Sequence, residues 1–175
     1  MLSKRYKICI VGVGGFAKEV FQIIKENLLV ENINPVDVCY FLVKDNEFSN
    51  QKIFGVDTLP ESKFNPDVYE LVVAIGDSAI RKTVVDKFPT STIYPKIISQ
   101  HAIVSDYVSI GEGTIICHGA ILTCDIEIGV HAHINLNSTI GHDCKIGDFF
   151  TCSPGVNISG NCTILNQVYL GTSAM

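Results

Sequence analysis

The sequence predicts a small α/β domain followed by a parallel β-helix, and two patterns carry this prediction. In the first half, short apolar strands alternate with amphipathic helices, which is typical of a parallel α/β sheet. In the second half, from Val104 to Met175, an apolar residue returns at every sixth position. That period is neither the 3.6-residue repeat of an α-helix nor the alternation of a hairpin, and it indicates a parallel β-helix. We expect the first domain to span residues 1–95 and the second residues 96–175.

The first domain opens with a strand, a glycine-rich turn and a helix. The strand is expected at residues 6–11 and the helix from about Ala17 to Leu29. Gly12, Gly14 and Gly15 lie between them, and the turn fits the G-x-G-x-x-A pattern. Glycines let the backbone approach a diphosphate, whose charge the helix N-terminus favours. The alternative is a tight strand–helix turn with no ligand.

The rest of this domain continues the alternation of strand and helix. The elements are expected at residues 36–43 (strand), 52–59 (exposed hairpin or loop), 70–75 (strand), 79–88 (helix capped by Ser78) and 92–94 (strand). Asp45 follows the second strand, near where an acid can bind a ribose, although a solvated loop acid is the alternative. A domain of about 90 residues holds only one of the two halves of a dinucleotide fold, so one nucleotide is favoured over NAD.

The hexads of the second domain begin at Val104 and run to Met175 without insertion. Their first positions are all apolar and their fifth positions mostly small, so both are expected to point inward from short strands. The third and fourth positions, such as Pro154-Gly155, have turn chemistry and are expected at corners. Three hexads close one triangular coil, and the apolar corners are expected to face outward and to contact other subunits. These apolar corner residues are Val130, Leu136 and Phe149.

Composition narrows the classes of partner. The net charge of −5 over 175 residues makes nucleic acid and anionic membranes poor partners, and no apolar run is long enough to span a bilayer. We expect no signal peptide. The seven cysteines include no Cys-x-x-Cys pair, and they are expected to be reduced apolar filler, which fits the cytoplasm.

Three segments resemble a known family. Hexads that start with Ile-Gly, as at Ile110, Ile128 and Ile140, resemble the hexapeptide-repeat acyltransferases. The segment 134–149 is similar to the active-site segment of the sialic acid O-acetyltransferase family, which includes bacillosamine and perosamine N-acetyltransferases. Residues 74–81 match the Ala-Ile-Gly-Asp-x-x-x-Arg segment of these enzymes. The resemblance implies a left-handed β-helix, a Rossmann-like first domain that binds a nucleotide-linked sugar, acetyl-CoA as donor, and a homotrimer.

The resemblance also implies roles for single residues. His142 is expected to be the general base, since the pKa of imidazole lies near neutral, and Asp143 to orient it. An exposed corner histidine is the alternative, and His118 is taken as structural. The residues expected to bind the sugar nucleotide are Gly12, Gly14, Gly15, Asp45, Gly76, Asp77, Arg81 and Asn135. The residues expected near coenzyme A are Ser153, Gly155 and Gly160. No metal site is expected, because no ligand spacing supports one.

The chain departs from the family in two places. Several relatives have histidine where this chain has Phe16, and relatives continue for further coils beyond the position of Met175. The chain is therefore expected to be short at its C-terminus, with weak acetyl-CoA binding and low activity.

Three functions remain open. The first is N-acetylation of a nucleotide-linked amino sugar, with uridine or cytidine as the expected base, in surface-glycan synthesis. The second is O-acetylation of a sialic acid, and the third is a non-catalytic nucleotide-sugar-binding or assembly subunit.

Overall fold

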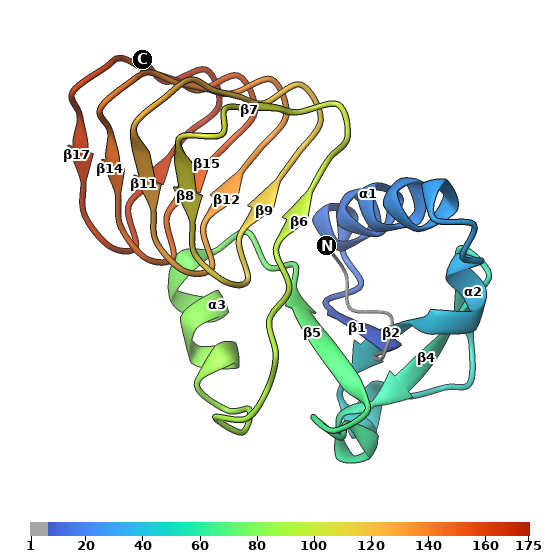
Figure 1. Cartoon of the computed structure of the whole chain (residues 1–175). Coiled ribbons are helices and arrows are strands. Elements are labelled where there is room, and N and C mark those ends of the chain that lie inside the picture. The colour runs from blue at the N-terminus through green and yellow to red at the C-terminus, as the bar shows by residue number, and fades with distance from the viewer. Residues whose placement is uncertain (1–6) are drawn as a thin grey trace.

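The computed structural model describes residues 7–175 and shows two domains packed side by side (Figure 1). The first contains a five-stranded sheet in the order β3-β4-β2-β1-β5, in which only β3 is antiparallel to its neighbour. Its elements are β1 (Lys7–Val11), α1 (Gly15–Val30), α2 (Pro35–Val38), β2 (Cys39–Val43), η1 (Asp45–Glu47), β3 (Lys52–Ile53), β4 (Val56–Pro60), η2 (Glu61–Lys63), β5 (Tyr69–Val73) and α3 (Ser78–Val85).

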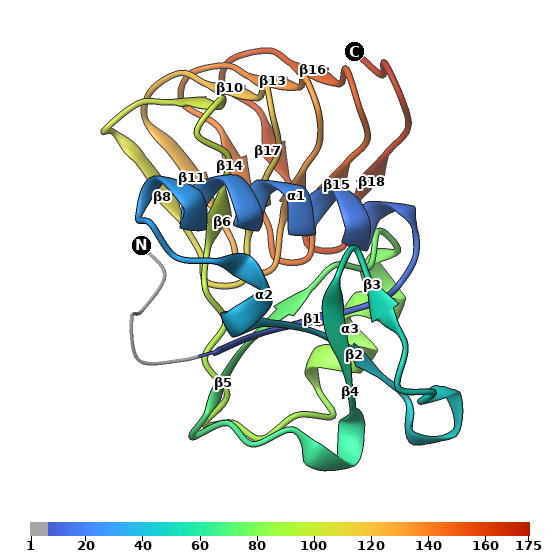
Figure 2. The same ribbon diagram turned by 90° about the vertical axis from the view of Figure 1, so that its right-hand side faces the viewer.

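Helix α1 lies between the sheet and the β-helix, as Figure 2 shows. Its apolar side chains recur at the spacing of a helical face, and Val20, Ile24 and Leu28 are buried. They share one core with strands β1, β2 and β5 on one side and with Ile115 of the β-helix on the other. Helix α3 covers the opposite face of the sheet, where a second core includes Cys9.

Four predictions for this domain need correction or qualification. The second strand starts later than expected, because Pro35 begins the short helix α2. Residues 52–59 do form a hairpin, but β4 pairs with β2 and buries Val56, so the hairpin is part of the sheet. Residues 92–94 form no strand, although the Ile93 carbonyl accepts a hydrogen bond from the amide of Leu71. Tyr6, which the first strand was expected to include, lies outside the described residues.

The second domain is a three-sided parallel β-helix. The docking face, which packs on the first domain, consists of β6 (Ile97–Ile98), β9 (Ile115–Ile116), β12 (His133–Ile134), β15 (Thr151–Cys152) and β18 (Tyr169–Leu170). The second face consists of β7 (Ile103–Val104), β10 (Ile121–Leu122), β13 (Thr139–Ile140) and β16 (Asn157–Ile158). The third face consists of β8 (Val108–Ile110), β11 (Ile126–Ile128), β14 (Lys145–Ile146) and β17 (Thr163–Ile164).

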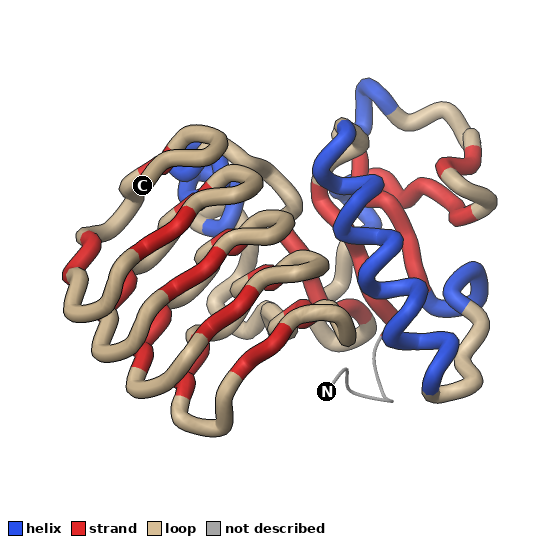
Figure 3. Tube along the Cα trace, turned by 90° about the horizontal axis from the view of Figure 1, so that it is seen from above, coloured by secondary structure: helices blue, strands red, loops and turns tan. Residues whose placement is uncertain are grey.

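The hexad pattern predicts the register of these faces. Paired residues such as Ile121 and Thr139 are 18 residues apart, which is one coil of three hexads. The β-helix starts before Val104, where the hexads were expected to begin, because Ile98 already pairs with Ile116. Seen from above, the coils stack as successive triangular turns (Figure 3).

Corners occur where the sequence places them, and the fourth position of each hexad has a left-handed backbone from Gly113 onward. The residues with positive φ are Gly113, Gly119, Asp125, His131, Asn137, Asp143, Phe149, Gly155, Asn161, Gln167 and Ser173. Glycine, asparagine and aspartate tolerate this conformation best, and they hold most of these positions.

Two of the three apolar corners do not form the outward surface that the sequence predicts. Phe149 is buried, with its ring stacked on His131 and Lys82 of α3 above it. Leu136 packs against the core that includes α1. Both residues therefore bury surface against the chain's own first domain, and the expectation that they contact other subunits is wrong.

Candidate active site

His142 and Asp143 form an exposed pair at the corner between β13 and β14. Nδ1 of His142 lies 2.7 Å from Oδ2 of Asp143, and the two side chains are 57% and 55% exposed. A carboxylate only accepts hydrogen bonds, so Nδ1 carries the proton and donates it to Asp143. Nε2 is then the free basic nitrogen. The arrangement is that of an oriented general base.

Gly160 provides the surface on which this imidazole rests. It follows His142 by one coil, and a Cβ atom built on Gly160 would lie 2.7 Å from Cε1 and 2.8 Å from Nε2 of His142. Any larger residue would push the ring away. The predicted coenzyme contact is thus placed directly beneath the candidate base, a role that sequence reasoning did not assign.

A cavity of about 470 Å³ lies at the carboxyl ends of β1 and β2, beside α3. Gly12, Lys44, Glu47, Ala79 and Lys87 are among the residues that line it. In parallel α/β sheets, ligands bind in this kind of crevice outside the carboxyl ends of strands.

The N-terminus of α1 adjoins this cavity through Gly12 and is suited to an anion. Its N-cap is Gly14, which provides no side-chain hydrogen bond, and its first turn contains no acid. Cβ atoms built on Gly14 and Gly15 would meet no atom within 4 Å, so the backbone is open to a ligand. Gly12 differs, because its φ of 110° and the nearby Ala74 carbonyl require a glycine.

A second cavity, of about 550 Å³, lies between the two domains at the N-terminus of α3. Gly76, Asp77 and Ala79 line it from the first domain, and Gln167 and Tyr169 from the β-helix. Ala79 also lines the first cavity, so the two cavities are neighbours.

Two acids predicted to bind the sugar nucleotide are engaged elsewhere. The carboxylate of Asp45 accepts hydrogen bonds from the amide and hydroxyl of Ser62, and the acids that line the first cavity are Glu47 and Glu61. Asp77 caps α3 by accepting a hydrogen bond from the amide of Ile80 at 2.8 Å, a role predicted for Ser78.

Asn135 lies on the docking face. Its Oδ1 accepts a hydrogen bond from the backbone amide of Leu136. Its side chain is thus held against its own corner, half-buried.

Arg81 is fully buried and joins the domains, which does not fit the predicted contact with a substrate. Its guanidinium donates to the carbonyls of Ile75, His131 and Phe149 and to the hydroxyl of Thr151 at 2.7 to 2.9 Å. Burial lowers the pKa of Arg81 to about 10. The match of residues 74–81 to a family segment gave no signal that this side chain points into the interface rather than into a site.

Two histidines accompany Arg81 in the interface. His133 lies 3.1 Å from the guanidinium through Nδ1, and Phe16 packs on its ring at 5.0 Å between centroids. Burial, and then the charge of Arg81, lowers the pKa of His131 to about 4 and that of His133 well below its usual value. Both rings are therefore neutral packing elements at pH 7.

The predicted coenzyme residues do not form one cluster in a single chain. Ser153 is buried and donates to the hydroxyl of Tyr169 at 2.8 Å. Gly155 is at the corner that joins the docking face to the second face, with φ of 72°. Gly160 is at the next corner, beside His142.

The candidate base and the cavities of the first domain lie on different sides of the β-helix. His142 is at the corner between the second and third faces, opposite the docking face that packs on α1. In Figure 1 the third face, with β14, is on the side of the β-helix that points away from the first domain. One chain therefore does not bring the base and the first domain together.

Comparisons with known proteins agree with this architecture. Residues 7–88 match the PglD N-terminal domain family. The chain is 27% identical over 170 residues to the GDP-perosamine N-acetyltransferase of Escherichia coli O157:H7, and the match covers 95% of this chain and 76% of that protein.

Two solved structures share the fold. WeeI from Acinetobacter baumannii AYE is 28% identical, with a TM-score of 0.85 over 96% of this chain and 79% of that one. A histidine-to-asparagine variant of perosamine N-acetyltransferase from Caulobacter crescentus, in complex with CoA and GDP-perosamine, is 25% identical. Its TM-score is 0.79, over 94% of this chain and 77% of that one. The predicted fold class, a Rossmann-like domain followed by a left-handed parallel β-helix of hexapeptide repeats, is confirmed.

Proposed function

We propose that this chain, a member of the hexapeptide-repeat acyltransferase family that includes bacillosamine and perosamine N-acetyltransferases, acetylates the amino group of a nucleotide-linked sugar for surface-glycan synthesis. Acetyl-CoA is the donor. The observation that carries the proposal is the His142–Asp143 pair, whose side chains are exposed. The similar proteins from Escherichia and Caulobacter are named for this kind of reaction, and the Caulobacter protein was solved with CoA and GDP-perosamine.

The chemistry requires one proton transfer. The amine nitrogen of the sugar attacks the thioester carbonyl carbon, and Nε2 of His142 takes the proton that the nitrogen loses. The carbon–sulfur bond then breaks, and coenzyme A leaves as the thiolate. Asp143 holds the ring and stabilises the imidazolium that forms, since its carboxylate accepts from Nδ1. The products are the N-acetyl sugar nucleotide and coenzyme A.

The first domain holds the acceptor in this proposal. The diphosphate binds the open amides at Gly14 and Gly15, where the dipole of α1 favours negative charge. The base and ribose occupy the first cavity, beside Lys44 and Glu47. The sugar extends over Gly76 into the second cavity.

We place the reaction in a homotrimer in the cytoplasm. The base of one chain lies away from its own first domain, so the first domain of a neighbouring chain must supply the acceptor. Acetyl-CoA then binds between two β-helices, where Gly155 of one chain and Gly160 of another can meet it. All seven cysteines are free, which suits a compartment that keeps thiols reduced.

None of the helices in residues 7–175 is long and apolar enough to cross a membrane.

An acetyl-transfer assay tests the proposal. Thiol release from acetyl-CoA is measured with GDP-, UDP- and CMP-linked amino sugars, their hydroxyl analogues and free sialic acid. Guanosine joins the expected uridine and cytidine because two similar proteins are named for a GDP-sugar or were solved with one. We expect turnover with an amino sugar nucleotide only. Turnover with sialic acid would favour O-acetylation, and binding without any turnover would favour the assembly subunit.

A variant at His142 distinguishes acetyl transfer at this site from the activity of a contaminating enzyme. His142→Ala is expected to lower kcat by about 10²–10⁴-fold, the usual contribution of a general base, while the circular dichroism spectrum is unchanged. Asp143→Asn should retain more activity, because the base remains. Wild-type turnover in His142→Ala would remove this residue from the mechanism.

A further inference from the structure

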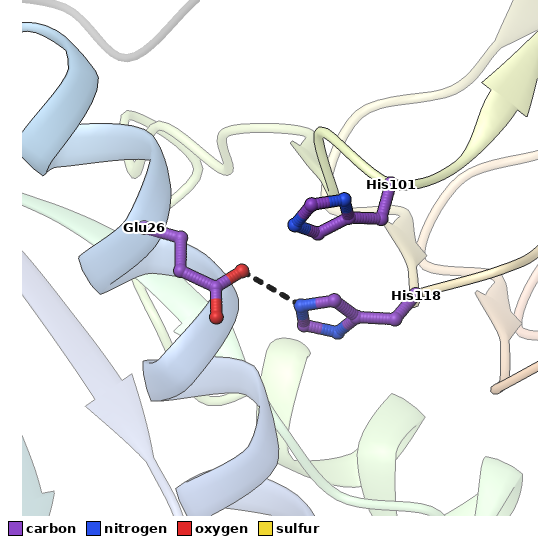
Figure 4. A group of neighbouring side chains, drawn as sticks. All are labelled: Glu26, His101 and His118. Atoms are coloured by element: carbon purple, nitrogen blue, oxygen red, sulfur yellow. Dashed lines mark hydrogen bonds and ion pairs between the residues drawn. The ribbon is translucent and has the colours of Figure 1, made fainter.

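Three metal-ligating side chains meet where α1 touches the first two coils of the β-helix (Figure 4). Glu26 comes from α1, His101 from the turn after β6, and His118 from the turn after β9. One donor atom of each lies within 4.8 Å of the other two. In Figure 4 the two imidazoles lie one above the other, and both point toward the carboxylate.

The fold fixes the backbone at each of these positions. The amide of Gly119 donates to the carbonyl of His101 at 3.0 Å, so the two histidine turns are stacked as neighbouring coils. Asn27 donates its side-chain amide to the carbonyl of Ile98 at 2.9 Å, which ties α1 to the same corner. The three side chains therefore lie close together because the two domains pack in this way, and not because of the position of one mobile side chain.

We propose that Glu26, His101 and His118 bind a divalent transition metal of the zinc class. Two imidazoles and a carboxylate are a ligand set that zinc takes, with a fourth position left for water. At metal–ligand distances near 2.1 Å, tetrahedral donors are about 3.4 Å apart. The Nε2 of His118 and the Oε2 of Glu26 are 2.7 Å apart, and the group spans no more than 4.8 Å. A slight separation of these two atoms makes room for the ion, which replaces the proton of the hydrogen bond between them.

The carboxylate also has outer support. Nε2 of Gln22, one turn earlier on α1, donates to Oε1 of Glu26 at 2.9 Å. This bond holds the carboxylate so that Oε2 faces the histidines, as partners of metal ligands commonly do. The two rings are stacked at 5.5 Å between centroids and 22° between planes, and one donor nitrogen of each lies within 4.8 Å of the carboxylate.

The bound ion ties the first domain to the β-helix. It joins α1 to two coils at the corner between the docking face and the second face, away from the corner that holds His142. The site therefore stabilises the angle of α1 and takes no part in acetyl transfer.

Metal binding to tag-free protein, stripped with a chelator at pH 7.5, tests the proposal. Calorimetry with Zn²⁺ should give one site per chain, and Co²⁺ should give the visible bands of a four-coordinate complex. Loss of an outer partner already weakens metal binding by about 10–100-fold, so loss of a ligand in His118→Gln or Glu26→Gln should cost at least about 100-fold. Zn²⁺ should raise the melting temperature of the wild type but not of these two variants.

His142→Gln is the matched control, since it removes another exposed histidine that pairs with a carboxylate, and it should leave Zn²⁺ affinity unchanged. If the other ligand variants do not fold, His101→Gln still tests the ligand set, because this side chain is exposed and its loss should not disturb the fold. Absence of Zn²⁺ binding overturns the proposal. Equal affinity in the wild type and in the folded His101→Gln and His118→Gln variants also overturns it, by assigning the metal to other groups such as the cysteines.

Discussion

Gly160 is restricted by its contact with the ring of His142, the proposed base. At Gly160 the absence of a side chain leaves room for the ring of His142, which a Cβ would approach within 2.7 Å. We expect Gly160→Ala to turn the imidazole away from Asp143 and to lower kcat at least about tenfold, part of the effect of removing the base.

Gly171→Ala is the control, because a Cβ there would meet nothing within 4 Å. Steady-state kinetics and the thermal melt are measured for both variants. A Gly160→Ala enzyme with the kcat of the wild type would show that the ring does not depend on this surface.

Acid should destabilise the protein through its buried histidines. The pKa of His131 is about 4 in the fold, against about 6.5 when unfolded, so the unfolded chain binds more protons between these values. The contribution of His131 to the free energy of unfolding is present in full above its unfolded pKa of about 6.5 and is lost as the pH falls toward 4. Between pH 7.5 and 5.5 this loss is about 1 kcal/mol. His133 acts in the same direction.

Urea unfolding at pH 7.5 and 5.5 measures this slope. His131→Phe keeps an aromatic ring between Tyr94 and Phe149 but has no proton to bind, so its slope should be smaller. Carboxylates titrate mostly below this window and are the same in both proteins. Identical slopes would show that His131 does not titrate as its burial requires.

At the scale of the element, the N-terminus of α1 offers a test that separates stability from binding. An acid at Gly15 complements the helix dipole and should stabilise the helix by about 0.3–1 kcal/mol. The same charge repels a diphosphate at that position. Gly15→Asp is therefore expected to melt at or above the wild-type temperature, while its Kd for the sugar nucleotide rises at least about tenfold.

Gly15→Ala, which adds a Cβ into open space, should bind as the wild type does. Calorimetry with the preferred acceptor compares the three proteins. Unchanged affinity in Gly15→Asp would place the phosphates away from α1.

At the scale of the whole molecule, a site shared between chains predicts complementation. His142→Ala removes the base of one chain, and Gly15→Asp weakens the acceptor site of the other. In random mixed trimers, about a quarter of the sites combine an intact base with an intact neighbouring first domain. Co-expressed and purified mixed trimers should then recover about a quarter of wild-type turnover.

Light scattering measures the mass of the assembly, which should be that of a trimer. The turnover of each variant alone is the baseline. Mixed assemblies no more active than that baseline would place the base and the acceptor in one chain. A monomeric mass at micromolar concentration would contradict the trimer itself.

Much of the β-helix could be predicted, because its rules are local. Each hexad specifies its own inward residues and its own corner, so the register of Ile121 with Thr139 follows from the period alone. The pairing of His142 with Asp143 could be predicted for the same reason, since the two residues are adjacent in sequence.

The features that only the tertiary structure decided are those that depend on how the two domains pack. The sequence placed Arg81 in a substrate site and Leu136 on an outer surface, yet both lie against the other domain. It also took His118 as structural but gave no sign of its partner Glu26, which lies 2.7 Å from it across 92 positions of sequence. The sequence by itself determined the repeat, the corners and the His142–Asp143 pair, because neighbouring residues fix them. The interface came from the fold, because contacts between distant segments depend on the angle at which α1 meets the coils, and no local pattern encodes that angle.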